Sequence, residues 1–118
     1  MTVYVEKSEN STLESGVTNL MNAMIEDYKS MGSPDWDKST DMNKKYVKGL
    51  VAKKGKKYIK IMQDYSATSF IVAVDDDKKF KKGDVLFASS WNAPARNRAR
   101  GNVIDGGYGI NWTGAEYL

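Results

Sequence analysis

The sequence predicts one domain, residues 1–118, with an α+β fold: a long N-terminal amphipathic helix packed on a mostly antiparallel, barrel-like sheet of about six to seven short strands. Three observations predict this. The length of 118 residues fits a single core. Apolar residues recur at helical spacing over residues 13–28 and at strand spacing beyond residue 44. Because most strands follow the helix instead of alternating with it, we expect antiparallel pairing.

The helix is the clearest element. It follows a short predicted strand at residues 2–6. Ser11 and Glu14 form a capping-box pattern at its start, and Gly32 and Pro34 are typical of its end. Its apolar stripe, which we expect to be core, comprises Leu13, Val17, Leu20, Met21, Met24, Ile25 and Tyr28.

A polar loop is predicted at residues 33–43, anchored by Trp36, and β structure follows it. Residues 45–52 and 57–63 are predicted strands, joined by a hairpin loop at 53–56 in which Gly55 supplies a positive φ. In the second strand we expect Ile59 and Ile61 on one face, opposite Tyr58, Lys60 and Met62. Residues 75–79 and 81–84 are predicted turns, and further strands are predicted at 69–75, 85–89 and 108–112.

Charge is divided unevenly along the chain, although the net value is only +3. The acidic N-terminal strand and helix, residues 1–42, carry eight acidic and three basic side chains, a net −5. The basic, β-rich region, residues 43–118, carries fifteen basic and seven acidic side chains, a net +8. Such a division suggests a surface that faces a polyanion, or two halves that attract each other, which also allows a homodimer. Solvated lysines on a small domain are the simpler alternative.

The segment 91–102 is the most unusual part of the sequence, because all three arginines lie within five residues there. Arginine's planar guanidinium binds phosphate with two parallel hydrogen bonds and stacks on bases. In a short helix Arg96 and Arg100 would share a face, whereas in an extended loop Arg98 would join them. Trp91 and Asn97 add a stacking surface and an amide. The segment therefore suggests a nucleic-acid or phosphate contact, against the alternative of a solvated loop paired with the acidic third of the chain.

Lysine-rich turns around residues 53–57 and 78–82 are a second signal. Hairpin tips accept charge at little cost, and lysines at sheet edges discourage aggregation, so these turns also have a structural explanation. Aromatic residues next to lysines are nevertheless how small β domains stack unpaired bases. The candidate binding residues are Arg96, Arg98, Arg100, Trp91, Asn97, Tyr58, Lys60, Lys53, Lys54, Lys56, Lys79 and Lys82.

Several kinds of site find no support in the sequence. The chain has no cysteine and no histidine, so we expect no catalytic residues, no cofactor and no metal site. Residues 75–77 are three aspartates without the pattern of a calcium loop, and we interpret them as a polar turn. No apolar run suits a membrane helix or a signal peptide. We therefore expect no membrane partner and a cytoplasmic location, or a virion-associated one if the chain derives from a phage.

These observations favour a small, non-enzymatic nucleic-acid-binding or nucleic-acid-associated accessory module that uses a basic, arginine-anchored β surface, with DNA and RNA both open as partners. The alternative is a protein-interaction domain, such as an inhibitor, an adaptor or a structural accessory protein of a phage or bacterium. The arginines and the tryptophan of segment 91–102 also fit this alternative, because both residue types are enriched at interface hot spots. An enzyme that works without histidine or cysteine is the third reading.

Overall fold

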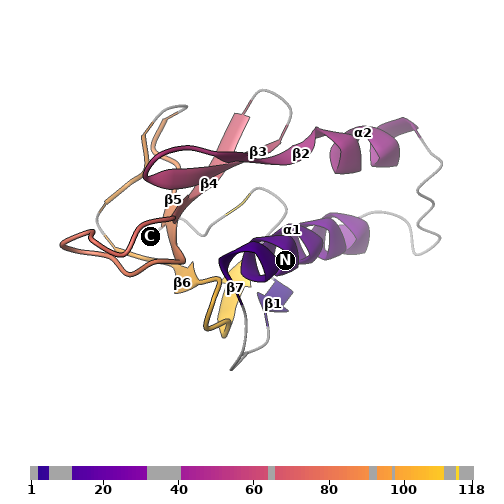
Figure 1. Ribbon diagram of the computed structural model, residues 1–118. Helices are drawn as coiled ribbons and strands as arrows, with labels where there is room; N and C mark the ends of the chain where they lie inside the picture. The colour runs from indigo at the N-terminus through magenta and orange to yellow at the C-terminus, as the bar shows by residue number, and fades with distance from the viewer. Residues whose placement is uncertain are drawn as a thin grey trace.

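The computed structural model describes residues 3–5, 12–31, 41–63, 66–90, 93–96, 98–110 and 114. One long helix packs against one face of an antiparallel sheet, and a short helix leads directly into the first strand of that sheet (Figure 1). The predicted α+β class is therefore confirmed. The described elements are β1 (Val3–Val5), α1 (Leu13–Met31), α2 (Asp41–Gly49), β2 (Leu50–Lys54), β3 (Tyr58–Gln63), β4 (Ser66–Val72), β5 (Asp84–Phe87), β6 (Gly101–Asn102) and β7 (Tyr108–Ile110).

The main sheet has five strands in the order β2-β3-β4-β5-β6, with each strand antiparallel to its neighbour. Strands β1 and β7 form a separate antiparallel pair, with Val3 opposite Ile110. Within the described residues the main sheet is open, with β2 and β6 at its edges, so the predicted barrel-like closure is not confirmed. The apolar face of the sheet is covered by α1 and the β1–β7 pair, and burying it does not require the sheet to close.

Helix α1 begins at a capping box one residue later than the sequence pattern indicated. The Thr12 hydroxyl accepts a hydrogen bond from the backbone N–H of Ser15 at 3.1 Å, and the Ser15 hydroxyl accepts one from the N–H of Thr12 at 2.9 Å. These two reciprocal bonds satisfy donors that a helix start otherwise leaves unpaired. The predicted partner Ser11 lies outside the described residues, and Glu14 is exposed in the first turn.

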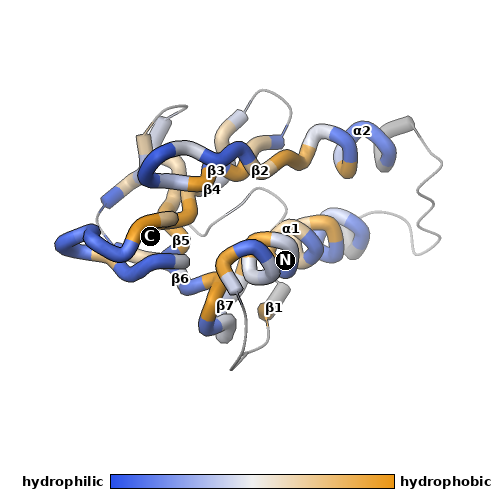
Figure 2. Tube along the Cα trace, in the orientation of Figure 1, coloured by the Kyte–Doolittle hydropathy of each residue, from blue (hydrophilic) through white to orange (hydrophobic). Residues whose placement is uncertain are grey.

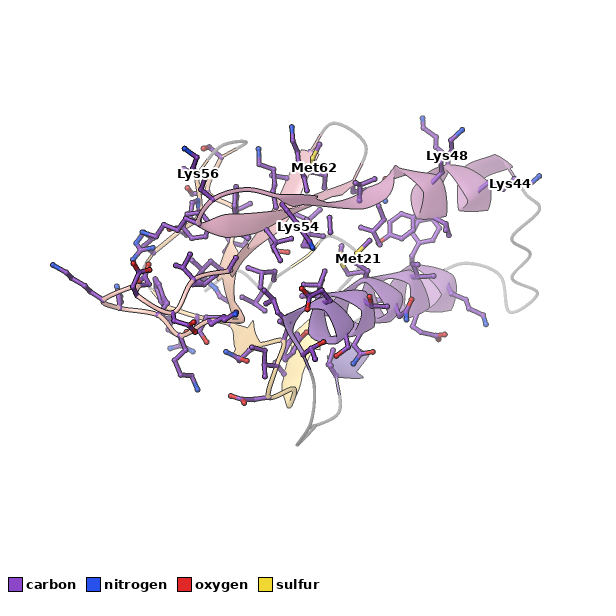
Figure 3. All side chains as sticks on the ribbon, in the orientation of Figure 1. Met21, Lys44, Lys48, Lys54, Lys56 and Met62 are labelled. Carbon is purple, nitrogen blue, oxygen red and sulfur yellow. The ribbon has the colours of Figure 1, made fainter. Side chains whose placement is uncertain are left out.

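The apolar stripe of α1 forms the main core, as predicted. Leu20 and Met24 are completely buried, and Met21, at the edge of the stripe, points toward the sheet (Figure 3). Gly16 lets α1 approach the chain after β6, because a Cβ at this position would lie 2.2 Å from the Val103 carbonyl oxygen. The main core comprises Val5, Val17, Leu20, Ala23, Met24, Tyr46, Leu50, Ile59, Ile61, Ile71, Val85, Val103, Tyr108 and Ile110, with Leu13, Met21, Ile25 and Tyr28 packed against it.

The chain before β2 was predicted wrongly. Residues 41–43 were expected in a loop and 45–49 in a strand, but all of them belong to α2. The helix buries Tyr46, whose ring stacks on Tyr28 of α1 with centroids 4.1 Å apart, and whose hydroxyl donates to the Met24 carbonyl at 3.4 Å. Burial, together with the charge of Asp27, raises the pKa of Tyr46. Short apolar stretches fit a strand or a helix equally by spacing, and here contact with α1 decides.

The predicted hairpin is confirmed, with Lys54 opposite Ile59 and the Gly55 N–H donating to the Tyr58 carbonyl at 2.9 Å. Its loop comprises residues 55–57 and not 53–56, because Lys53 and Lys54 belong to β2. Gly55 does not have a positive φ, so that part of the prediction is wrong; Gly83, with φ 93°, has one in the predicted turn at 81–84. The predicted division of β3 is also confirmed, since Ile59 and Ile61 are buried in the main core. Trp36 and residues 111–112 of the last predicted strand lie outside the described residues.

Strand β4 is displaced toward the N-terminus, because the structure places it at Ser66–Val72 where residues 69–75 were predicted. Its partner β3 is irregular between Ile61 and Met62, where the register of the ladder shifts. Within the part of the chain that the structure describes, no helix has the length and apolar character needed to cross a membrane.

Candidate nucleic-acid interface

The face of the sheet opposite α1, which we call the outer face, carries a second and smaller core. Strand alternation directs Phe70 and Val72 of β4 and Leu86 of β5 to this side, and Phe80 from the following turn covers them. All four are buried, and the half-buried Tyr58 of β3 packs against them. The outer face is thus an aromatic surface framed by the polar turns that the chain makes around it.

The arginine segment is extended along β5, so it is not the short helix that the sequence allowed. Ala88 and Pro94 form an antiparallel bridge, the Ala95 N–H donates to the Phe87 carbonyl at 2.7 Å, and the Arg100 N–H donates to the Val85 carbonyl at 2.7 Å. These bonds fix residues 93–96 and 98–100 beside the outer face. Trp91 and Asn97, both candidate binding residues, lie outside the described residues.

Arg96 contacts two separate parts of the outer face, the turn at 77–80 and Tyr58 of β3. Its Nη2 donates to Asp77 Oδ1 at 2.9 Å and its Nη1 donates to the Tyr58 hydroxyl at 2.5 Å. Its guanidinium also lies over the Phe80 ring, with Cζ 4.9 Å from the centroid. We call Asp77, Arg96 and Tyr58 the arginine latch. The ion pair with Asp77 raises the pKa of Arg96, so the guanidinium remains charged.

Asp77 is the centre of the latch. Its Oδ1 also accepts hydrogen bonds from the backbone N–H groups of Lys79 at 2.9 Å and Phe80 at 3.0 Å, while its Oδ2 lies 3.3 Å from Lys57 Nζ. The bond from Arg96, and then those from the backbone, hold the pKa of the Asp77 carboxyl well below its usual range. The carboxylate is fully covered by these neighbours, although it lies near the surface of the fold. The predicted polar turn at 75–77 is therefore confirmed, and its last aspartate organises it.

Lysines from the β2–β3 hairpin surround a shallow cavity of about 240 Å³, which we call the lysine cavity. Its aromatic floor is Tyr58 and Phe70, whose rings meet edge to face with centroids 5.8 Å apart. Lys54 and Lys56 extend from the hairpin in Figure 3. The lining residues are Lys53, Lys54, Gly55, Lys56, Lys57, Tyr58, Lys60 and Phe70.

A second cavity, of about 490 Å³, adjoins the first. The two cavities share Lys56 and Lys57, and the second one reaches the arginine latch and the turn at 74–78. Figure 2 shows the hairpin tip and the turn as hydrophilic segments at the same end of the molecule. The second cavity is lined by Lys56, Lys57, Val74, Asp76, Asp77, Lys78 and Arg96.

The structure brings most of the candidate residues together, but not all of them. Lys79 donates to the Arg96 carbonyl and lies over Phe80, so it supports the latch. Arg100 is half-buried over the Phe87 ring and donates to the Arg98 carbonyl at 2.7 Å; burial lowers its pKa. Arg98 is exposed, and Arg98, Arg100 and Lys82 line neither of the two cavities.

The list of candidate binding residues left out four residues of this site: Lys57, Phe70, Asp77 and Phe80. Phe70 could have been found from strand alternation, since it lies opposite Lys60 in the β3–β4 ladder. Asp77 carries a local signal too, because an aspartate two residues before the Lys79 N–H often closes a turn through its own side chain. Its pairing with Arg96 has no local signal, because the two residues are 19 positions apart.

Comparison with known proteins places the chain in a family but assigns it no activity. The chain matches no curated protein and no solved structure. A family model described as a family of unknown function, DUF7717, matches residues 2–116, which is nearly the whole chain. The chain therefore belongs to the DUF7717 family.

Proposed function

We propose that this protein is a non-enzymatic nucleic-acid-binding module that holds the phosphate backbone at the lysine cavity. One observation carries the proposal: five lysines of a single hairpin line one cavity that has an aromatic floor. Lysine neutralises phosphate as a point charge, and the release of counterions from the nucleic acid drives such binding.

The structure changes which residues we assign to this role. The Arg96 guanidinium directs donors to Asp77 and Tyr58 within the protein. We therefore assign the main phosphate contacts to the hairpin lysines and give Arg96 the role of holding Tyr58 and the neighbouring turn. Lys53, Lys54 and Lys56 are all exposed at the rim of the lysine cavity, where a phosphate backbone can reach them.

The adjoining cavity extends this surface. It adds Lys78, while Asp77 is already surrounded by Arg96, Lys57 and backbone donors. A nucleic-acid strand that passes from one cavity to the other therefore meets cations along its path, with Asp76 as an acidic group beside it. This arrangement supports a track along the hairpin tip in preference to a single isolated phosphate site.

Salt dependence of binding tests the proposal. Fluorescence anisotropy with labelled single-stranded and duplex oligonucleotides should give a log K that falls linearly with log salt. For about four to five phosphate contacts on a single strand, we expect a slope of about −3 to −3.5. No binding at low salt and tens of micromolar protein would overturn the proposal and favour a protein partner.

A matched pair of triple variants locates the contacts. Changing Lys53, Lys54 and Lys56 to glutamine should reduce the magnitude of the slope by about 2, because three contacts are lost. Changing Lys44, Lys45 and Lys48 to glutamine removes the same charge from exposed positions of α2, which lies at the other end of β2 from the hairpin tip (Figure 3), and should leave the slope nearly unchanged. Equal losses in the two variants would mean that net charge alone drives binding and that the lysine cavity is not the site.

A further inference from the structure

The lysine cavity combines charged side chains with aromatic ones, which simple attraction to phosphate does not need. Tyr58 is half-buried and Phe70 is 3% exposed, and both rings nevertheless line the cavity. Lys57 Nζ lies 5.6 Å from the Tyr58 centroid, and Lys60 Nζ lies 5.8 Å from the Phe70 centroid. The cations therefore stand directly beside the rings, within cation–π distance.

The strand register adds a second observation. Lys53 of β2 lies directly opposite Lys60 of β3, and Lys60 lies opposite Phe70 of β4, so the three residues form one row across the outer face. Like charges that face each other across an antiparallel ladder destabilise the sheet. An anionic ligand bound above this row would relieve that repulsion, because it would lie close to both lysines at once.

The arginine latch fixes the floor of the cavity before any ligand arrives. Arg96 holds the Tyr58 hydroxyl at 2.5 Å, and Asp77 holds Arg96 at 2.9 Å. Tyr58 is therefore restrained at both ends, by its backbone in β3 and by its hydroxyl. A ring that is already fixed in place loses little conformational entropy when a flat ligand stacks on it.

From these observations we infer that the lysine cavity accepts one unpaired nucleobase against Tyr58, while the lysines bind the flanking phosphates. This inference rests on the proposed function and makes it more specific: the preferred ligand is single-stranded nucleic acid. In a duplex both faces of each base are already stacked, so only an unpaired base can reach the ring. The volume of about 240 Å³ agrees, because it lies below the roughly 300–1,000 Å³ of sites that enclose whole small-molecule ligands.

An abasic oligonucleotide provides the direct test, because it has the charge and length of the normal strand but no bases. At fixed salt we expect the wild-type protein to bind the abasic strand about 5- to 150-fold more weakly than the normal strand, the loss expected when one stacked base is removed. A duplex of the same sequence should also bind more weakly. The comparison is made with a DNA strand and with an RNA strand. A gap, meaning weaker binding of the abasic strand than of the normal strand, supports the inference if it is found with either nucleic acid. Equal affinities with both DNA and RNA overturn it.

Two substitutions of Tyr58 serve as matched controls. Tyr58→Leu removes the ring and should abolish the difference in affinity between normal and abasic strands. Tyr58→Phe keeps the ring and should retain most of the gap. If Tyr58→Leu fails to fold, the comparison of normal and abasic strands on the wild-type protein still decides. Equal binding of the two strands overturns base insertion but leaves the proposed function standing, whereas no binding of either strand overturns both.

Discussion

The two faces of the main sheet are stabilised by different interactions. The inner face buries aliphatic side chains such as Ile61 and Ile71 against α1, whose Leu20 and Met24 are completely removed from water. The outer face buries two phenylalanines among four apolar residues and completes its cover with the arginine latch. Burial of apolar area contributes most of the stability of a fold and does not depend on direction. Hydrogen bonds and ion pairs each contribute less, but they require a specific geometry. The inner face therefore holds the fold together, and the outer face positions individual side chains.

This difference explains why the candidate site lies on the outer face. A face that is sealed by a helix has no room for a ligand, but a face covered by turns leaves the half-buried Tyr58 ring and the lysine stems within reach of solvent. The latch supplies the rigidity that packing supplies on the other side, since Asp77 receives hydrogen bonds from both Arg96 and the backbone. Three substitutions test this difference between the two faces.

The largest effect is expected in the centre of the inner face. Leu20→Ala should lower the free energy of unfolding by about 2–5 kcal/mol, because it leaves a cavity where the side chain is completely buried. Urea denaturation followed by circular dichroism would measure this. Val51→Ala is the control, since Val51 is 48% exposed on β2 and its loss should stay within about 0.5 kcal/mol. An unchanged transition midpoint for Leu20→Ala would mean that α1 is peripheral and that the inner face is not the main core.

An intermediate effect is expected where α1 meets the chain after β6. Gly16→Ala places a methyl group 2.2 Å from the Val103 carbonyl oxygen, so α1 must move away. Overpacking of this kind costs about 1–3 kcal/mol, which should outweigh the gain of up to about 1 kcal/mol that alanine brings to a helix. Asn19→Ala also introduces an alanine into α1, at an exposed position where nothing is overpacked, and should be neutral or stabilising. Gly16→Ala as stable as the wild type would show that α1 can shift on the inner face without loss.

The smallest effect is expected on the outer face, and it should depend on pH. Asp77→Asn should lower the melting temperature less than Leu20→Ala does, because it removes directional contacts and leaves the apolar core intact. The pKa of Asp77 is lowered in the folded state, so its stabilisation is fully present above the unfolded value of about 3.9 and is lost as pH falls below it. The difference in melting temperature from the wild type should therefore be constant above about pH 5 and shrink toward pH 2.

Asp75→Asn is the control for this measurement, because it removes the same charge from the same turn at an exposed position. It should change the melting temperature little at any pH. A difference between wild type and Asp77→Asn that is as large at pH 2 as at pH 7 would contradict the role of the Asp77 carboxylate in the latch.

Local patterns in the sequence predicted a large part of this fold. The stripe of α1, the β2–β3 hairpin and the alternation within β3 all follow from side-chain spacing, because a helix or strand must turn its apolar residues to one side. The same patterns placed Tyr58 and the hairpin lysines together, since they belong to one hairpin. The local errors were small ones of position, such as the capping box formed by Thr12 instead of Ser11.

The remaining features depend on contacts between distant residues. The segment 41–49 is a helix whose Tyr46 stacks on Tyr28 of α1. The main sheet is open among the described residues, and α1 and the β1–β7 pair cover its inner face. Arg96 was predicted as an anchor for a ligand from its residue type and from the clustering of three arginines in one segment. The structure shows it bound to Asp77, 19 positions away, and to Tyr58, 38 positions away. Spacing along the chain determines which side chains share a face, but only the folded backbone decides which charges meet, because loop closure brings together residues that no local pattern relates.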